Sequence, residues 1–283
     1  MKNKVVQPVL KWAGGKRQLL PKIKKLIPKN IGTYYEPFLG GGAVLFSLQP
    51  GHAIVNDNNT ELINMYDVIK NNVDAIILDL RKHRNEADYF YKIRGLDRTP
   101  QYNEMNNVQR ASRLIYLNKT CYNGLFRVNK NGEFNVPFGR YKNPNIVNET
   151  VLRAVSNYLN TGRIELLNMD FEQALIGCEH SSFVYFDPPY YPVSDSSNFT
   201  GYTVNGFTKE DQIRLKSLCD KLTDKGVRWL LSNSSSPFII SLYNSKKYHI
   251  DYVTANRSIS SNPDARGEVK EVLIRNYEIE TNR

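Results

Sequence analysis

A carboxylate, two prolines and an aromatic ring follow a strongly apolar run in the segment Phe183-Val184-Tyr185-Phe186-Asp187-Pro188-Pro189-Tyr190. The run predicts a buried strand that ends at Asp187, because proline cannot continue the regular backbone. At the carboxyl end of a strand in an α/β sheet, a carboxylate lies beside the ligand crevice. The prolines remove N–H donors and leave carbonyl acceptors. Asp187 and the Pro188 carbonyl would then form an acceptor-rich surface beside Tyr190.

Asp187 is compatible with three roles. It could be a turn residue before the prolines, since Asp-Pro favours turns. It could ligate a metal, although no second carboxylate or histidine lies nearby at ligand spacing, so we expect no metal. It could also accept hydrogens from the exocyclic amine of a nucleobase, which is a poor nucleophile until acceptors favour a tetrahedral nitrogen. Tyr190 would stack on that base, which must first leave the duplex.

A glycine turn lies between an apolar strand pattern and a helical one in Glu36-Pro37-Phe38-Leu39-Gly40-Gly41-Gly42-Ala43-Val44-Leu45-Phe46. Asp57 ends the next strand, roughly 20 residues later, where a carboxylate binds ribose hydroxyls in nucleotide-binding folds. A plain turn with a helix-capping aspartate is the alternative. The packed glycines depart from the G-x-G-x-x-G pattern of dinucleotide sites and favour an adenosyl ligand without phosphates.

A second glycine cluster, Lys11-Trp12-Ala13-Gly14-Gly15-Lys16-Arg17, superficially resembles a phosphate-binding P-loop. Leu10 stands where the first glycine is required, and Arg17 replaces the Ser or Thr that holds magnesium. We therefore exclude a nucleoside triphosphate here. The lysine and tryptophan could instead contact a carboxylate and an adenine face.

Strand and helix patterns alternate along most of the chain, which predicts an α/β doubly wound sheet. Helical periods include 150–158 and 209–222. The expected strands are the apolar runs 34–38, 53–55, 164–167, 183–186, 229–231 and 271–274.

The central part of the chain differs from this alternation. It is mainly helical, rich in Arg and Lys, and contains Asn131-Gly132 between alternating flanks, a strong hairpin signal. We therefore expect one catalytic domain (1–60 and 149–283), interrupted by a target-recognition domain (61–148).

Composition restricts the class of protein and its partners. The net charge of +10 and the pI of about 9.3 favour a polyanionic partner. Eighteen tyrosines add aromatic rings that can stack bases. Three widely spaced cysteines and four scattered histidines argue against a disulfide framework or a zinc site. There is no signal-peptide pattern and no apolar run of about 18 residues, so we expect a cytoplasmic protein without a membrane segment.

These motifs together resemble the Dam-type, GATC-specific DNA adenine-N6 methyltransferases. The resemblance runs from Lys11 to about Tyr277. It rests on the two glycine clusters, on Asp187-Pro188-Pro189-Tyr190, on Tyr122-Asn123-Gly124-Leu125-Phe126-Arg127, and on Phe134-Asn135-Val136-Pro137-Phe138-Gly139-Arg140-Tyr141-Lys142. The motif order is the α arrangement of that class. The resemblance implies a Rossmann-like S-adenosylmethionine-dependent methyltransferase sheet with an inserted, mainly helical target-recognition domain carrying a β-hairpin.

The resemblance also implies roles for individual residues. Asp187, Pro188 and Tyr190 would be catalytic and hold the flipped adenine. The donor S-adenosyl-L-methionine would be surrounded by Trp12, Lys16, Phe38, Gly40, Gly42, Asp57 and Asp187, with Asp57 on the ribose. Double-stranded DNA containing GATC would be contacted by Lys11, Tyr122, Asn123, Leu125, Arg127, Pro137 and Tyr141. Among these, Arg127 would recognise a guanine, and Tyr122 and Leu125 would wedge into the opened stack.

Other targets and roles stay open at this level. The same chemistry could act on cytosine-N4, an RNA adenine or a protein amide, although cytosine enzymes tend to have serine, and amide enzymes asparagine, in place of Asp187. A non-catalytic DNA-binding module would show an eroded catalytic motif, and this motif is whole.

The biological role is also open. The sequence would look alike for the modification enzyme of a restriction-modification system, which has a cognate endonuclease, and for a solitary methylase. We expect the segment 194–207 to close over the base. The oligomeric state is not predicted.

Overall fold

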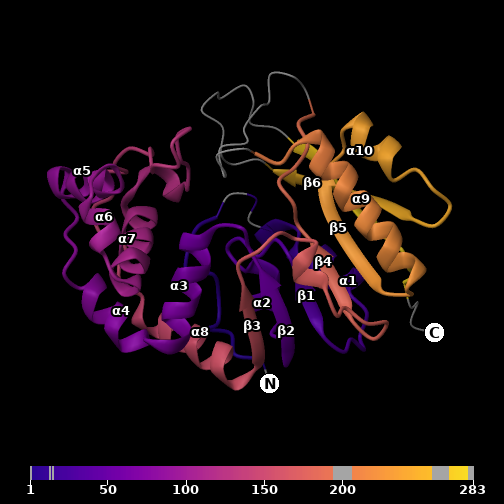
Figure 1. Cartoon of the computed structure of the whole chain (residues 1–283), viewed down its shortest axis with the longest axis horizontal. Coiled ribbons are helices and arrows are strands. Elements are labelled where there is room, and N and C mark those ends of the chain that lie inside the picture. Colours follow the sequence, from indigo (N-terminus) through magenta and orange to yellow (C-terminus); the bar gives the residue numbers. More distant parts are fainter. Residues whose placement is uncertain (1, 13, 15, 194–205, 257–267, 280–283) are drawn as a thin grey trace.

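The computed structural model describes residues 2–12, 14, 16–193, 206–256 and 268–279 (Figure 1). Across these residues, seven strands form one sheet in the order β3-β2-β1-β4-β5-β7-β6. The pairings are parallel except for those of β7, which runs antiparallel to β5 and β6. The strands are β1 (Tyr34–Glu36), β2 (His52–Asn56), β3 (Arg163–Leu167), β4 (Phe183–Phe186), β5 (Arg228–Ser234), β6 (His249–Asn256) and β7 (Glu268–Arg275). The predicted Rossmann-like α/β sheet is confirmed.

The predicted strands are all present, and β6 is the strand that the sequence analysis missed. It lies at the edge of the sheet, where one side has no neighbour, and Tyr252 on it is 61% exposed. Its residues mix polar and apolar types without regular alternation, as in His249-Ile250-Asp251-Tyr252-Val253, rather than forming an apolar run.

Helices cover both faces of the sheet and, on one side, form a lobe (Figure 1). The helices are α1 (Leu20–Leu26), α2 (Ala43–Leu48), α3 (Thr60–Asn71), α4 (Val73–Leu80), α5 (Ala87–Gly95), α6 (Gln101–Glu104), α7 (Asn107–Thr120), α8 (Glu149–Thr161), α9 (Lys209–Asp224) and α10 (Pro237–Leu242). Short 3-10 turns are η1 (Lys16–Gln18), η2 (Leu96–Arg98), η3 (Tyr122–Gly124) and η4 (Gln173–Leu175). None of the helices in the described ranges is long and apolar enough to cross a membrane.

The central strands are buried on both faces, which explains their continuous apolar sequence. Alternate side chains of β4 enter different cores: Phe183 and Tyr185 join the core with α1, α2, α3 and α8, whereas Val184 and Phe186 join the core with α9 and α10. This is the two-residue period of a strand. The sheet is thereby held rigidly from both sides, and so is the point where β4 ends.

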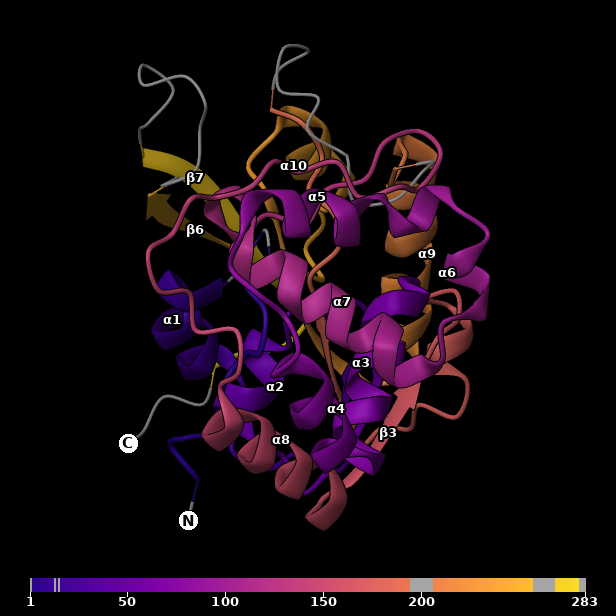
Figure 2. The ribbon, with the colours of Figure 1, turned by 90° about the vertical axis from the view of Figure 1, so that its left-hand side faces the viewer.

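The inserted region lies between β2 and β3, beside the edge strand β3 (Figure 1). In Figure 2, which faces this lobe, α7 crosses its middle, with α5 above and α3, α4 and α8 below. Buried residues of α3, α4, α7 and α8 belong to the same apolar core as one face of the sheet. Because this core is continuous, the domain boundaries near residues 61 and 148 stay a prediction.

The predicted β-hairpin is present near the end of the insert. Val128 and Phe134 form an antiparallel bridge. The Gly132 N–H donates to the Asn129 carbonyl, and the Asn129 N–H to the Glu133 carbonyl. The turn therefore has a three-residue loop, with Gly132 in the left-handed region at φ +79°. Asn131-Gly132 was a correct signal, although it lies within a longer loop than a two-residue turn.

His83 is held inside the helical lobe as a neutral side chain. Its ring stacks on Tyr116 with centroids 4.3 Å apart, and its nitrogens bond the hydroxyls of Tyr89 (2.9 Å) and Ser112 (3.1 Å). Burial, helped by the charge of Lys82 and opposed by Asp79, lowers the pKa of His83 to about 4.

We predict that His83 makes the protein less stable in mild acid. The unfolded chain binds a proton at this histidine below about pH 6.5, whereas the folded chain does so only near pH 4. The free energy of unfolding should therefore decrease as the pH falls between these values, by up to about 3 kcal/mol from this group. Urea unfolding of wild type and His83→Phe across this range tests it. The variant should show a flatter dependence on pH, and equal slopes would contradict the assignment.

Candidate active site

The carboxyl ends of four parallel strands bring the predicted catalytic and donor-binding residues to one edge of the sheet. Asp187 follows β4, the Gly40 turn follows β1, Asp57 follows β2, and Ser234 ends β5. Strands β2, β1, β4 and β5 are consecutive neighbours in the sheet. Residues far apart in sequence are therefore close in space, where open α/β sheets bind their ligands.

Asp187 forms an ion pair with Lys16 at this edge. The Lys16 Nζ lies 2.7 Å from Oδ1 of Asp187, and the lysine side chain is 5% exposed. The same ammonium donates to the Gly14 carbonyl over 2.7 Å. No well-directed hydrogen bond reaches Asp187 Oδ1 from the described residues, although this oxygen is buried. The charge of Asp187 is thus compensated by an ammonium that contacts Oδ1 without a well-directed hydrogen bond.

Two carboxyl groups near this ion pair have raised pKa values. Burial raises the pKa of Asp187 to about 6, opposed by Lys16 and assisted by the charge of Glu271. Burial also raises the pKa of Glu36 to about 8, even though the Tyr34 hydroxyl donates to its Oε2 over 2.8 Å. Near neutral pH, the site therefore holds a charged Asp187 beside a predominantly neutral Glu36.

The ring of Tyr190 lies under the ammonium of Lys16. The centroid is 4.6 Å from Lys16 Nζ, and the Tyr190 hydroxyl donates to Oε2 of Glu271 over 2.8 Å. Asp187, Pro188 and Tyr190 are thus brought together with Lys16. The ammonium occupies the place beside both Asp187 and the ring where an amine of a stacked base was expected.

A buried amide network, absent from the sequence analysis, supports the segment after Asp187. Gln212 of α9 donates to the Pro189 carbonyl (2.9 Å) and accepts from Asn233 of β5 (3.0 Å). Asn233 also accepts from the Tyr191 N–H (3.1 Å), and Ser234 donates to the Tyr191 carbonyl (2.6 Å). The Pro189 carbonyl therefore already accepts a hydrogen bond from this network, whereas the acceptor role beside Asp187 was predicted for the Pro188 carbonyl. The polar run Ser232-Asn233-Ser234 after an apolar strand was the available signal.

Asp57 connects the end of β2 to the glycine turn. Its Oδ2 accepts from the Gly40 N–H and its Oδ1 from the Asn59 N–H, both over 2.9 Å. Gly40 has φ +50°, and a Cβ there would lie 2.9 Å from the ring of Trp12. The predicted residues Trp12, Gly40 and Asp57 therefore form one surface. Gly42 continues the turn, and Phe38 packs on Phe171 with centroids 5.3 Å apart.

The N-terminal segment also contacts the inserted region. Trp12 stacks on Phe126, with centroids 4.7 Å apart and planes 20° apart. Asn118 accepts from the Lys11 N–H (2.9 Å) and donates to the carbonyls of Lys11 (2.8 Å) and Gly124 (2.9 Å). The glycine turn and the hairpin are therefore joined through residues 11 and 12. Asn118 was not predicted, because an amide inside a helix has no distinctive pattern.

The residues expected to contact DNA form a second group around the hairpin. Tyr122, Asn123 and Pro137 are exposed, and the Tyr122 N–H donates to the Pro137 carbonyl over 2.8 Å. Arg127 donates from Nε to Oδ1 of Asn135 over 2.7 Å, which restrains the guanidinium. The remaining members of this predicted set are the exposed Lys11 and the half-buried Leu125 and Tyr141.

Asp97 of η2 holds the second strand of the hairpin and was also missed. Its Oδ2 accepts from the Phe134 N–H (2.7 Å) and pairs with Arg113 (2.8 Å). Arg98 pairs with Asp97 and donates to the Phe134 carbonyl, both over 2.8 Å. Arg98 and Arg113 thus help to position the hairpin.

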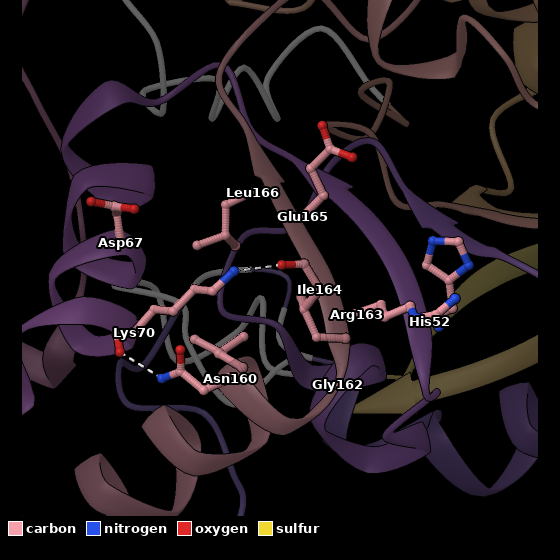
Figure 3. A pocket seen from close by; sticks show the side chains of 10 residues that line it. His52, Asp67, Lys70, Asn160, Gly162, Arg163, Ile164, Glu165 and Leu166 are labelled. Carbon is pink, nitrogen blue, oxygen red and sulfur yellow. Dashed lines mark hydrogen bonds between the residues drawn. The ribbon is translucent and has the colours of Figure 1, made fainter.

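A separate depression of about 450 Å³ lies at the edge strand β3 (Figure 3). Its polar groups bond to one another: Lys70 donates to the Ile164 carbonyl (2.7 Å), and Asn160 to the Lys70 carbonyl (2.6 Å). None of the predicted site residues lines it. Of the segment 194–207, which we expect to close over the base, residues 194–205 lie outside the described residues.

The fold and the site together define an amino-methyltransferase of the Rossmann-like class. The sequence model of the family "D12 class N6 adenine-specific DNA methyltransferase" matches residues 12–259, and the chain belongs to this family. It is therefore an adenine-specific DNA methyltransferase, as the sequence motifs predicted.

Named relatives support the same class. The chain is 44% identical to the Type II methyltransferase M1.LlaDCHI of Lactococcus lactis subsp. cremoris, over 98% of both chains. It is also 44% identical to the Type II methyltransferase M.MjaIII of Methanocaldococcus jannaschii, over 96% of this chain and 99% of the relative. The DNA adenine methylase of Escherichia coli K12 is 35% identical over 93% of both chains.

The raised pKa of Asp187 predicts an acidic limit of methyl transfer. An ionised carboxylate is a stronger hydrogen-bond acceptor than the protonated acid, so the rate should decrease as the pH falls through about 6. The dependence of kcat/KM on pH, measured with a methylatable duplex, tests this. Asp187→Asn cannot titrate, so its residual rate should lack this limb. A wild-type limb near pH 4, typical of exposed carboxylates, would contradict the effect of burial.

Proposed function

We propose that this protein transfers a methyl group from S-adenosyl-L-methionine to N6 of adenine in duplex GATC, after flipping the base out of the helix. The observation that supports it most is the buried Oδ1 of Asp187, which lacks a well-directed hydrogen bond from the described residues and contacts the same ammonium as the ring of Tyr190. The hairpin motif with Arg127 supports the choice of sequence.

The residues around the glycine turn fit the methyl donor. S-adenosyl-L-methionine supplies an electrophilic methyl group when bound. Trp12 offers an aromatic face against Gly40, and Phe38 precedes the turn and packs on Phe171. Each carboxylate oxygen of Asp57 accepts one backbone N–H and keeps a second acceptor position. That capacity suits a ribose hydroxyl.

Asp187 and the Pro188 carbonyl would accept the two hydrogens of the adenine amine. These bonds favour a tetrahedral nitrogen and direct its lone pair toward the methyl group. Lys16 must first release Asp187, because its ammonium uses the same oxygen. As the new N–C bond forms, the bond between the methyl carbon and the donor sulfur would break and leave the neutral thioether. The nitrogen would lose a proton, which a carboxylate with a pKa of about 6 can accept. Tyr190 would stack on the extruded base.

Sequence choice would come from the hairpin and its neighbours. Arg127 suits bidentate contact with O6 and N7 of a guanine, and Asn135 already restrains its guanidinium. Tyr122 and Leu125 would enter the opened stack, while Lys11, Asn123, Pro137 and Tyr141 would contact the other bases of the site.

The biological role we propose is modification within a restriction-modification system. Two relatives at 44% identity are named Type II methyltransferases. The relatives at 35% and 36% identity are named DNA adenine methylases, which favours a solitary GATC methylase as the alternative. An adjacent gene for an endonuclease that cleaves GATC would distinguish the two roles.

A labelling experiment tests the reaction and its site. With labelled donor, duplexes containing GATC should be methylated at adenine N6, whereas duplexes with a scrambled site should not. Asp187→Ala should abolish transfer, and Asp224→Ala, which changes an exposed aspartate, serves as control. Equal labelling of both duplexes would overturn the specificity, and N4-methylcytosine in the product would favour a different target.

Arg127→Ala should lose about 1–3 kcal/mol of discrimination at one guanine of the site. Arg127→Lys is the matched variant, because it keeps the charge and loses the fork of donors. Both variants should lose more affinity for GATC duplexes than for duplexes of other sequences when the affinities are compared at constant salt. If Arg127→Ala weakened GATC and scrambled duplexes equally, Arg127 would be a phosphate contact instead.

A further inference from the structure

Glu271 is the partner of the Tyr190 hydroxyl, and no motif of the sequence includes it. The hydroxyl donates to Oε2 of Glu271 over 2.8 Å. Tyr190 follows β4, whereas Glu271 belongs to β7, which lies two strands away in the sheet. The bond therefore joins segments that are 81 residues apart in the chain.

The direction of β7 brings Glu271 to the edge that holds the active site. Because β7 is antiparallel to β5, its first residues lie beside the carboxyl end of β5, and Glu271 is opposite Ser234. On its other side, Glu271 is opposite Val253 of β6. The same edge of the sheet holds Asp187, directly after β4, which is the other neighbour of β5.

A carboxylate at this position has an electrostatic cost. Glu271 adds to the rise in the pKa of Asp187 that burial causes, and Lys16 opposes that rise. An uncharged acceptor could bind the Tyr190 hydroxyl without this repulsion. A charged acceptor, however, makes a hydrogen bond roughly twice as strong as a neutral one. Burial, then the charges of Asp187 and Glu271, raise the pKa of Tyr190 well above its ordinary value, so the phenol keeps the proton that it donates.

The hydroxyl of a tyrosine lies on the long axis of its ring, so anchoring it fixes where that axis points. The face of the anchored ring is turned toward Lys16 Nζ, 4.6 Å from the centroid, and that ammonium also contacts Asp187. We infer that Glu271 is a positioning residue, which holds the ring of Tyr190 at the height and tilt required for stacking of the target base. This inference rests on the function proposed above.

A set of five variants tests the inference. Glu271→Ala removes the acceptor, Glu271→Gln keeps an acceptor oxygen without the charge, and Tyr190→Phe keeps the ring without the hydroxyl. The double variant Tyr190→Phe/Glu271→Ala tests whether the two groups act through each other. Glu278→Gln, an exposed glutamate that follows β7, is the control. The measurements are kcat and KM on a GATC duplex, donor binding by calorimetry, and fluorescence of 2-aminopurine in place of the target adenine.

Glu271→Ala and Tyr190→Phe should each lower kcat by about tenfold, as expected for loss of a charge-assisted bond. The double variant should be no slower than either single variant. Donor binding should be unchanged, and the extruded probe should fluoresce more than with wild type because a loosely held ring stacks on it less. Glu271→Gln should nearly restore kcat at neutral pH and shift the acidic limb to lower pH, since one negative charge near Asp187 is gone.

Two results would overturn the positioning role: a wild-type kcat in Glu271→Ala, or a full additional loss from Glu271→Ala in the Tyr190→Phe background. The wild-type rate separates this failure from failure of the proposed function. Absence of adenine labelling by the wild type overturns both, whereas normal wild-type labelling with independent variants overturns only the role of Glu271.

Discussion

The ion pair between Lys16 and Asp187 is the contact on which the arrangement of the site depends. A largely buried carboxylate would be disfavoured without a cation, and Lys16 supplies one at 2.7 Å from Oδ1 of Asp187. Lys16 also donates to the Gly14 carbonyl, and Trp12 of the same N-terminal segment lies against the glycine turn after β1. One charge interaction between distant parts of the chain thereby links the proposed donor-binding residues to the proposed acceptor residues.

Rigidity around this pair comes from polar side chains rather than from the backbone alone. Gln212 and Asn233 hold the segment after Asp187, while Glu271 holds the ring of Tyr190. On the other side, Asp97 holds the hairpin through the backbone of Phe134. Buried groups of this kind are costly when unpaired, so each pairing specifies one geometry. Oδ1 of Asp187 is the exception, because it receives no well-directed hydrogen bond from the described residues.

Features that depend on residues adjacent in the sequence could be predicted, whereas features that depend on tertiary contacts could not. The strand before Asp187, the turn at Gly40 and the hairpin near Gly132 each follow from a local pattern of apolar residues, glycine and proline. The residues that support them are remote: 42 positions separate Tyr191 from Asn233, 37 separate Phe134 from Asp97, and 107 separate Lys11 from Asn118. A single amide or carboxylate in a helix or strand has no pattern that reveals its partner.

The stacking of Trp12 on Phe126 limits how the inserted region can be exchanged between related genes. Most of the residues proposed to choose the target lie in one continuous insert between β2 and β3, which a single recombination event could exchange. An exchange of that insert alone would separate Phe126 and Asn118 from the partners they hold in residues 11 and 12. The unit that can pass intact between proteins is therefore the insert together with the short N-terminal segment, although the two are far apart in the gene.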